Sequence, residues 1–222
     1  MTNFMRQLDI FNPEDFENYR ITIVGCGGIG SALGICLAKL GMKKFILWDA
    51  DLVQRHNVPN QLFEYGAAGY PKVEKLRDSI KNYHPDYSAE VVPFGRKLDS
   101  SCYIMTPIVF ACTDSMSSRK LIYEVALKSR CRLLIDGRMS GKAFRIFTVN
   151  LTRKSDRDAY ERTLHEDMEQ SCTNRAIIYN IFAVSSFMAN QLTRVFQNKK
   201  YPFEMNVCLE NYLIRNRYLE KR

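Results

Sequence analysis

A glycine-rich turn between a short apolar strand and a helix is the feature that most restricts how this sequence can fold. The β-branched run from Arg20 to Val24 predicts a buried strand, and Gly25-Cys26-Gly27-Gly28-Ile29-Gly30 follows it directly. Ser31 to Leu40 is then predicted as a helix, because Gly41 provides a stop. Glycines let the chain turn tightly, so that backbone N–H groups at the helix start can face a phosphate.

Strands and helices alternate beyond this unit. Further strands are predicted at 44–48, 89–94, 108–112 and 132–135, with helices at 71–83 and 120–129. This alternation predicts an α/β fold with a Rossmann-like, mostly parallel sheet that has helices on both faces.

The composition of the sequence changes after Asn150. Residues 151–174 are rich in charge and lack an apolar period, so we predict a long polar connection there. Residues 175–196 predict a buried helix, and the alternation over 203–209 predicts a half-exposed C-terminal antiparallel strand. We expect one domain over 1–222, divided into an N-terminal arm (1–19), a nucleotide-binding core (20–150), a crossover loop (151–174) and a C-terminal helix and strand (175–222).

A carboxylate follows the second predicted strand. Asp49 is placed to accept hydrogen bonds from ribose hydroxyls, and with the glycine turn it predicts an adenine-nucleotide site. These features alone would suit a nicotinamide-dependent oxidoreductase equally well.

Several polar residues further along have no role in hydride transfer. Lys72 begins a predicted helix and can pair with phosphate oxygens, whereas Asp114 follows a parallel strand and can hold Mg²⁺. Asp51, Asn57 and Gln61 lie between Asp49 and Lys72 in the sequence. The combination favours a site that cleaves a nucleotide phosphate.

In order and spacing, these residues resemble the ThiF/MoeB/HesA family of ubiquitin-activating-enzyme-like adenylyltransferases. The resemblance runs from about Ile21 to Thr193 and rests on Gly25 to Gly30, Asp49-Ala50-Asp51, Asn57, Gln61, Pro71-Lys72-Val73 and Cys112-Thr113-Asp114 with Arg119. It implies ATP- and magnesium-dependent adenylation of the C-terminal carboxylate of a small ubiquitin-like or sulfur-carrier protein.

The resemblance also implies individual roles. Asp49 would hold the ribose, Asn57 and Lys72 would contact phosphates, and Asp114 would bind the magnesium ion. Arg6, within Met5-Arg6-Gln7, is similar to an N-terminal arginine that the family extends into the partner subunit's site, which implies a homodimer.

The sequence departs from the family pattern in two places. Asn60 stands where members usually carry an arginine, so one charge of the triphosphate clamp is missing unless Arg55 or Arg138 compensates. A family member that binds nucleotide without turnover therefore stays open as an alternative. Many members hold a structural zinc with two C-x-x-C pairs, and no such pair occurs here, so we expect no zinc at that position.

Cys172 ends the predicted polar connection, just before the predicted buried helix. Sulfur-transfer members of the family carry a cysteine at a similar place that can join covalently to the partner protein. The dipole at a helix start stabilises a thiolate, so Cys172 is the candidate for this role, although it would equally serve as an ordinary free thiol.

Bulk properties fit this interpretation. Seven cysteines without close pairing predict free thiols in a reducing, cytoplasmic compartment. The N-terminal residues lack a signal-peptide pattern, and the longest apolar stretch, 176–189, is too short and polar to span a membrane. The net charge of +8 favours a basic surface, and nothing in the sequence supports nucleic-acid binding.

Overall fold

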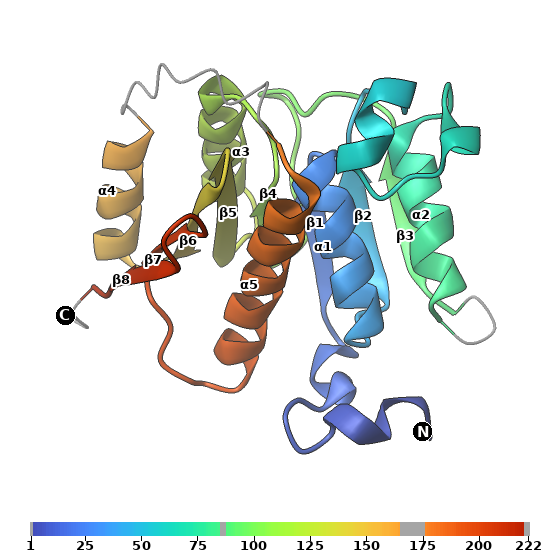
Figure 1. The fold of residues 1–222 in the computed structure, drawn as a ribbon. Helices are drawn as coiled ribbons and strands as arrows, with labels where there is room; N and C mark the ends of the chain where they lie inside the picture. The colour runs from blue at the N-terminus through green and yellow to red at the C-terminus, as the bar shows by residue number, and fades with distance from the viewer. Residues whose placement is uncertain (1, 85–87, 165–175, 220–222) are drawn as a thin grey trace.

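One eight-stranded sheet runs through the molecule in the order β3-β2-β1-β4-β5-β6-β7-β8 (Figure 1). The computed structural model describes residues 2–84, 88–164 and 176–219. The five parallel strands are β1 (Arg20–Val24), β2 (Lys44–Trp48), β3 (Glu90–Phe94), β4 (Ile108–Ala111) and β5 (Leu133–Ser140). The three antiparallel strands are β6 (Ala143–Asn150), β7 (Glu204–Cys208) and β8 (Leu213–Arg217). The predicted mostly parallel sheet with C-terminal antiparallel strands is confirmed.

Helices cover both faces of this sheet. One face packs against α1 (Gly28–Lys39), α2 (Lys72–Asn82) and α5 (Ile178–Phe196), and the other against α3 (Met116–Lys128) and α4 (Lys154–Thr163). Each layer has its own core, with Leu33, Leu76 and Met188 buried in the first and Ile122 and Tyr160 buried in the second.

Four short 3₁₀ segments complete the described elements. They are η1 (Thr2–Gln7), η2 (Pro13–Phe16), η3 (Arg55–Asn60) and η4 (Tyr65–Ala67). The N-terminal segment lies at the amino ends of the parallel strands, below the sheet in Figure 1. It is anchored there because the ring of Phe16 packs edge-on against Phe196, with 5.0 Å between centroids.

The strand order reverses direction at β1, which pairs with both β2 and β4. In an open α/β sheet, the loops that follow two such diverging strands leave a crevice at their carboxyl ends. The glycine turn after β1 and the Cys112-Thr113-Asp114 loop after β4 meet at this crevice.

The prediction of a polar connection over 151–174 is wrong for its first half, which forms α4. The inward face of this helix consists of Asp156, Ala159, Tyr160 and Thr163, at helical spacing. Three of these four side chains, all but Ala159, have polar groups that are hydrogen-bonded inside the protein, so hydrophobicity alone shows no period.

The antiparallel end of the sheet also differs from expectation. Strands β6 and β8 were not predicted, and the predicted strand at 132–135 extends to Ser140 as β5. On β7 the predicted alternation places Glu204 on the exposed side, but this residue is only 7% exposed and accepts a hydrogen bond from Arg145. No helix among the described residues is long and apolar enough to span a membrane.

Candidate functional site

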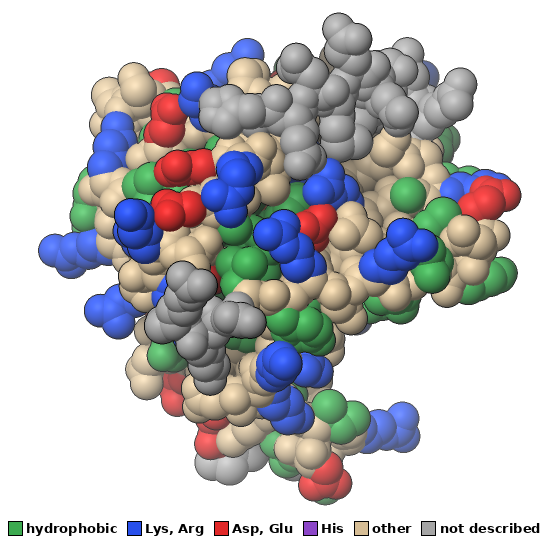
Figure 2. Space-filling model, turned by 90° about the vertical axis from the view of Figure 1, so that its left-hand side faces the viewer, with side chains coloured by type: hydrophobic (Ala, Val, Ile, Leu, Met, Phe, Trp, Pro, Cys, Tyr) green, Lys and Arg blue, Asp and Glu red, His purple; other side chains and the backbone are tan. Residues whose placement is uncertain are grey.

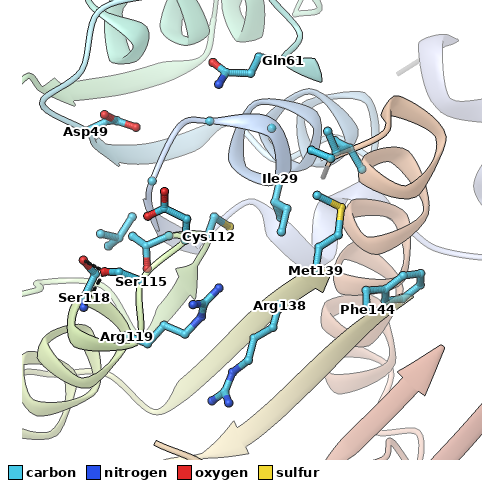
Figure 3. Close-up of a pocket in the computed structure, with 18 of the residues that line it drawn as sticks. Ile29, Asp49, Gln61, Cys112, Ser115, Ser118, Arg119, Arg138, Met139 and Phe144 are labelled. Atoms are coloured by element: carbon cyan, nitrogen blue, oxygen red, sulfur yellow. Dashed lines mark hydrogen bonds between the residues drawn. The ribbon is translucent and has the colours of Figure 1, made fainter. Parts of the chain in front are cut away.

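A cleft of about 1510 Å³ opens at the carboxyl ends of the parallel strands. Nine of the residues predicted from the sequence line it, namely Gly25, Gly27, Gly28, Asp49, Asp51, Asn57, Gln61, Lys72 and Asp114. Figure 3 shows side chains from the glycine turn, the loop after β4 and strand β5 around one cavity. Residues that are distant in the sequence thus converge as expected.

The glycine turn passes close to the neighbouring loop. Gly25 has a φ of +92°, and a Cβ there would lie 2.7 Å from the carbonyl oxygen of Cys112. Gly30 lies behind the turn rather than on the cleft wall, and its Cβ would lie 1.8 Å from the carbonyl oxygen of Gly25. By contrast, a Cβ on Gly27 would find its nearest neighbour 3.8 Å away, so a ligand can approach the start of α1 there.

Asp49 organises the turn as well as facing the cleft. Its carboxylate accepts hydrogen bonds from the backbone N–H groups of Cys26 (2.7 Å) and Asp51 (2.8 Å). Burial raises the pKa of Asp49, while these two N–H groups and the charge on Lys72 oppose the increase. Each carboxylate oxygen has a second lone pair, so Asp49 can still accept hydrogen bonds from ribose hydroxyls.

Lys72 is buried at the first position of α2, where its ammonium group lies 2.8 Å from the carboxylate of Asp51. The lysine side chain is 8% exposed and the aspartate side chain is 65% exposed. The ion pair therefore holds a cation in the wall of the cleft, with its partner on the solvent side.

Asp114 differs from Lys72 in both exposure and pairing. Its side chain is exposed, and within the described residues it makes no hydrogen bond or ion pair. The same loop then starts α3, with Ser115 Oγ accepting the N–H of Ser118 at 3.2 Å. A carboxylate presented in this way can supply one oxygen to Mg²⁺, which usually keeps several waters and takes others from phosphates.

Any metal ion in this cleft would have few carboxylate ligands among the described residues. The described part of the chain contains no group of three or more His, Cys, Asp or Glu side chains that could hold a metal ion. A cation bound at Asp114 would thus need oxygens from a bound nucleotide, in keeping with the way Mg²⁺ binds at phosphate-transferring sites.

Two buried polar atoms on the cleft wall have no protein partner in the described residues. These are Oε1 of Gln61 and Oγ1 of Thr113. A buried polar atom without a hydrogen bond costs on the order of 1–3 kcal/mol. A polar ligand such as a nucleotide would satisfy both atoms, so the residues present fit that class of ligand.

A buried ionic cluster under the cleft was not foreseen from the sequence. Asp136 is 0% exposed and accepts hydrogen bonds from Arg119 Nε (3.1 Å), Arg138 Nε (2.6 Å) and Tyr160 Oη (2.9 Å). Burial raises the pKa of Asp136, but the charges of Arg138 and Arg119 outweigh it, so the pKa is lowered overall. In Figure 3, Arg119 and Arg138 lie below the loop that carries Cys112.

The contacts in this cluster show whether Arg138 is available to replace the positive charge that is missing at Asn60. The guanidinium of Arg138 is held by Asp136 and also donates to the carbonyl oxygen (3.1 Å) and the hydroxyl (3.0 Å) of Thr163. Arg55 is exposed and lies outside the cleft lining. Neither is presented as a free phosphate ligand. Arg96 and Lys97, which follow β3, line the cleft instead, and the sequence had not singled them out.

Besides Gly30, two predicted residues are not part of this cleft as described. Arg6 is exposed on η1, at the amino ends of the strands, and so lies at the opposite end of the molecule from the cleft (Figure 1). Cys172 lies outside the described residues.

Comparison with known proteins agrees with this geometry. A profile of the ThiF family matches residues 5–220. Ubiquitin-like modifier-activating enzyme 5 of Xenopus laevis is 29% identical over 125 residues, which cover 50% of this chain and 32% of that protein. The molybdopterin-synthase adenylyltransferase of Salmonella typhimurium is 32% identical over 120 residues, which cover 52% of this chain and 47% of that protein. The aligned region is thus about a third to a half of each curated relative.

Solved structures show the same fold. E. coli MccB superposes with a TM-score of 0.74 at 13% identity, covering 95% of this chain and 65% of that one. E. coli MccB with ATP superposes with a TM-score of 0.70 at 15% identity, covering 93% of this chain and 65% of that one. Because the family profile spans nearly the whole sequence and the relatives named here are an activating enzyme and an adenylyltransferase, the chain belongs to the ThiF family.

Proposed function

We propose that the chain adenylates the C-terminal carboxylate of a small ubiquitin-like or sulfur-carrier protein, with Mg-ATP as the second substrate. One observation carries the proposal: the glycine turn, the buried ammonium of Lys72 and the exposed carboxylate of Asp114 line a single cleft. A dinucleotide-dependent oxidoreductase would use the first of these features and has no need of the other two. The names of the relatives and the MccB complex with ATP support the same conclusion.

The proposed chemistry gives each of these groups a role. An oxygen of the carrier's carboxylate attacks the α-phosphorus of ATP, a new P–O bond forms, and the bond to the β-phosphate breaks to release pyrophosphate. N–H groups at the start of α1 and the ammonium of Lys72 stabilise the charge on the phosphates. Asp114 would hold Mg²⁺, which supplies further neutralisation of the departing pyrophosphate.

A second step at Cys172 belongs to this proposal. Its thiolate would attack the acyl carbon of the adenylate, form a thioester and release AMP. The described cysteines support this assignment by their surroundings, because burial raises the pKa of Cys26 and Cys112, and raises that of Cys131 to about 12. Alkylation with peptide mapping would test whether Cys172 is the most reactive thiol, and its replacement by serine should abolish a thiol-sensitive adduct with the carrier.

We further propose a cytoplasmic homodimer in which Arg6 acts at the neighbouring subunit's cleft. Its distance from its own cleft supports this arrangement. Mixing inactive Arg6→Ala and Asp114→Ala proteins should restore about a quarter of wild-type activity, since half of the randomly formed dimers contain one intact site. If the mixture stays inactive while subunits exchange, Arg6 does not act across the interface.

ATP–pyrophosphate exchange tests the central proposal. The assay uses a small ubiquitin-like protein ending in Gly-Gly as the carrier, and calorimetry compares Mg-ATP with NAD. Exchange that depends on the carrier supports adenylation. Nucleotide binding without exchange would indicate a binding module, in line with Asn60 at the clamp position, and tighter binding of NAD would indicate the oxidoreductase.

A further inference from the structure

Four residues from four neighbouring strands form a row across one face of the sheet. The strand registers pair Arg138 with Arg145, Arg145 with Asn206, and Asn206 with Arg215. Directly paired residues point to the same face, and all four line the cleft. The cleft therefore continues from the nucleotide residues over β5, β6, β7 and β8, with three guanidinium groups along its course.

A second row runs beside the first, two residues further along β5. Its members are Ser140, Ala143, Cys208 and Leu213, which are paired in the same way and also line the cleft. Three of these side chains are small. The floor beside the arginines thus leaves room for the backbone of an extended chain to lie close to the sheet.

The arginines of this face are not equivalent. Arg138 is held by Asp136, and Arg145 donates to Glu204 at 2.8 Å. Glu204 also lies 3.7 Å from Arg217. Arg215 is exposed and forms no hydrogen bond or ion pair within the described residues.

The face as a whole carries excess positive charge. The arginines that line this part of the cleft are Arg119, Arg138, Arg145 and Arg215, and they face the carboxylates of Asp136 and Glu204, which leaves a net charge of +2. Figure 2 looks onto the side of the molecule where β8 and α4 lie, and shows Lys and Arg side chains, with Asp and Glu side chains among them, bordering hydrophobic side chains near its centre. A ligand here should combine an apolar or small backbone contact with negative charge.

From these observations we infer that Arg215 selects an acidic side chain on the extended C-terminal tail of the carrier protein. The inference rests on the proposed function and specifies the carrier's chemistry. Four strand spacings of about 4.8 Å separate β8 from β4, where Asp114 follows the strand, a span of about 19 Å. An extended chain covers about 3.3 Å per residue, so the acidic residue is expected about six positions before the terminal carboxylate.

Fluorescein-labelled heptapeptides that end in Gly-Gly test this inference with the full 222-residue chain. Three peptides carry Glu, Gln or Lys at the sixth position from the C-terminus, a fourth carries Glu at the third position, and all other positions are Ser. Binding is measured by anisotropy at low ionic strength. The wild type should bind the Glu peptide about fivefold more tightly than the Gln peptide, and the Lys peptide most weakly, because a partly desolvated charge pair contributes at this level.

Variants then assign the effect to one residue. Arg215→Glu should reverse the order so that the Lys peptide binds best, and Arg215→Gln should abolish the preference. Arg217→Glu is the matched control, since Arg217 lies on the same strand but outside the cleft lining, and it should keep the wild-type order. Thermal melts of all variants confirm folding.

The outcomes separate this inference from the proposed function. An unchanged order in Arg215→Glu, no preference in the wild type, equal affinity for the two Glu peptides, or no peptide binding at all would overturn the role of Arg215. A single-stranded oligonucleotide that displaces every peptide, and whose own binding is lost in Arg215→Glu, would overturn it in favour of a nucleic-acid site. Mg-ATP binding is measured by calorimetry in parallel. If Mg-ATP binds normally beside any of these results, only the role of Arg215 is contradicted and the proposed adenylation is not. Failure to bind Mg-ATP contradicts the proposed adenylation itself.

Discussion

The ammonium of Lys72 lies 2.8 Å from the carboxylate of Asp51, which joins the wall of the cleft to the loop after β2. This lysine is buried, so removal of its partner would leave a cation in a poorly solvated position. Asp51→Ala should therefore lower the free energy of unfolding by about 1–3 kcal/mol. Glu90→Ala breaks the exposed Arg20–Glu90 pair and should cost less than about 1 kcal/mol in the same urea titration. Equal effects of the two changes would mean that burial of Lys72 adds nothing.

Asp114→Ala should lower carrier-dependent pyrophosphate exchange by a hundredfold or more, because loss of a metal ligand removes several kcal/mol of charge stabilisation. The side chain is exposed and makes no bond within the described residues, so the melting temperature should stay within about 2 °C of wild type. Asp158→Ala, an exposed change on α4, serves as the control and should leave exchange intact. Normal exchange in Asp114→Ala would remove this residue from the site.

Gly30→Ala should disrupt the turn and abolish Mg-ATP binding. A Cβ at this position would lie 1.8 Å from the carbonyl oxygen of Gly25, so either the backbone moves or the helix start is displaced. We expect a loss of several kcal/mol of stability, on the scale of overpacking and backbone strain. Gly66→Ala meets nothing within 4 Å and should be nearly neutral in both assays. Wild-type affinity in Gly30→Ala would show that the turn tolerates distortion.

Asp136→Ala should destabilise the protein by about 3–5 kcal/mol, because it leaves Arg119 and Arg138 buried without their shared anion. The pKa of Asp136 is lowered in the folded state, so its stabilising contribution is complete above the unfolded value of about 3.9. That contribution is lost as the pH falls through the folded value, which lies lower still. The stability difference between wild type and variant should hold constant from pH 8 to about 4 and narrow only below that. A difference that shrinks already near pH 6 would contradict this assignment.

Local signals explain what could be predicted from the sequence. The strand, turn and helix around Gly25 to Gly30 lie next to one another in the chain, and strands that follow a regular alternation place Asp49 and Asp114 at the same sheet edge. The convergence of Lys72 with both residues followed from topology alone.

Features that depend on distant partners could not be predicted in this way. Asp136 and Thr163 look like ordinary polar residues in the sequence, yet both are buried because Arg138 pairs with them. Arg215 gains its position from strand registers that link β5 to β8 across the sheet. Neither the buried ion pairs nor the strand registers produce a periodic pattern of hydrophobic residues in the sequence.

Within the described residues, β8 is also an edge strand of the sheet, and its composition affects self-association. An exposed edge offers unpaired N–H and C=O groups to any other extended chain, including β8 of another molecule. Arg215 and Arg217 would meet like charges in such a side-by-side pairing, which opposes it. The arginines on β8 would then act as gatekeepers against edge-to-edge aggregation, and replacing both with valine should increase light scattering at high protein concentration.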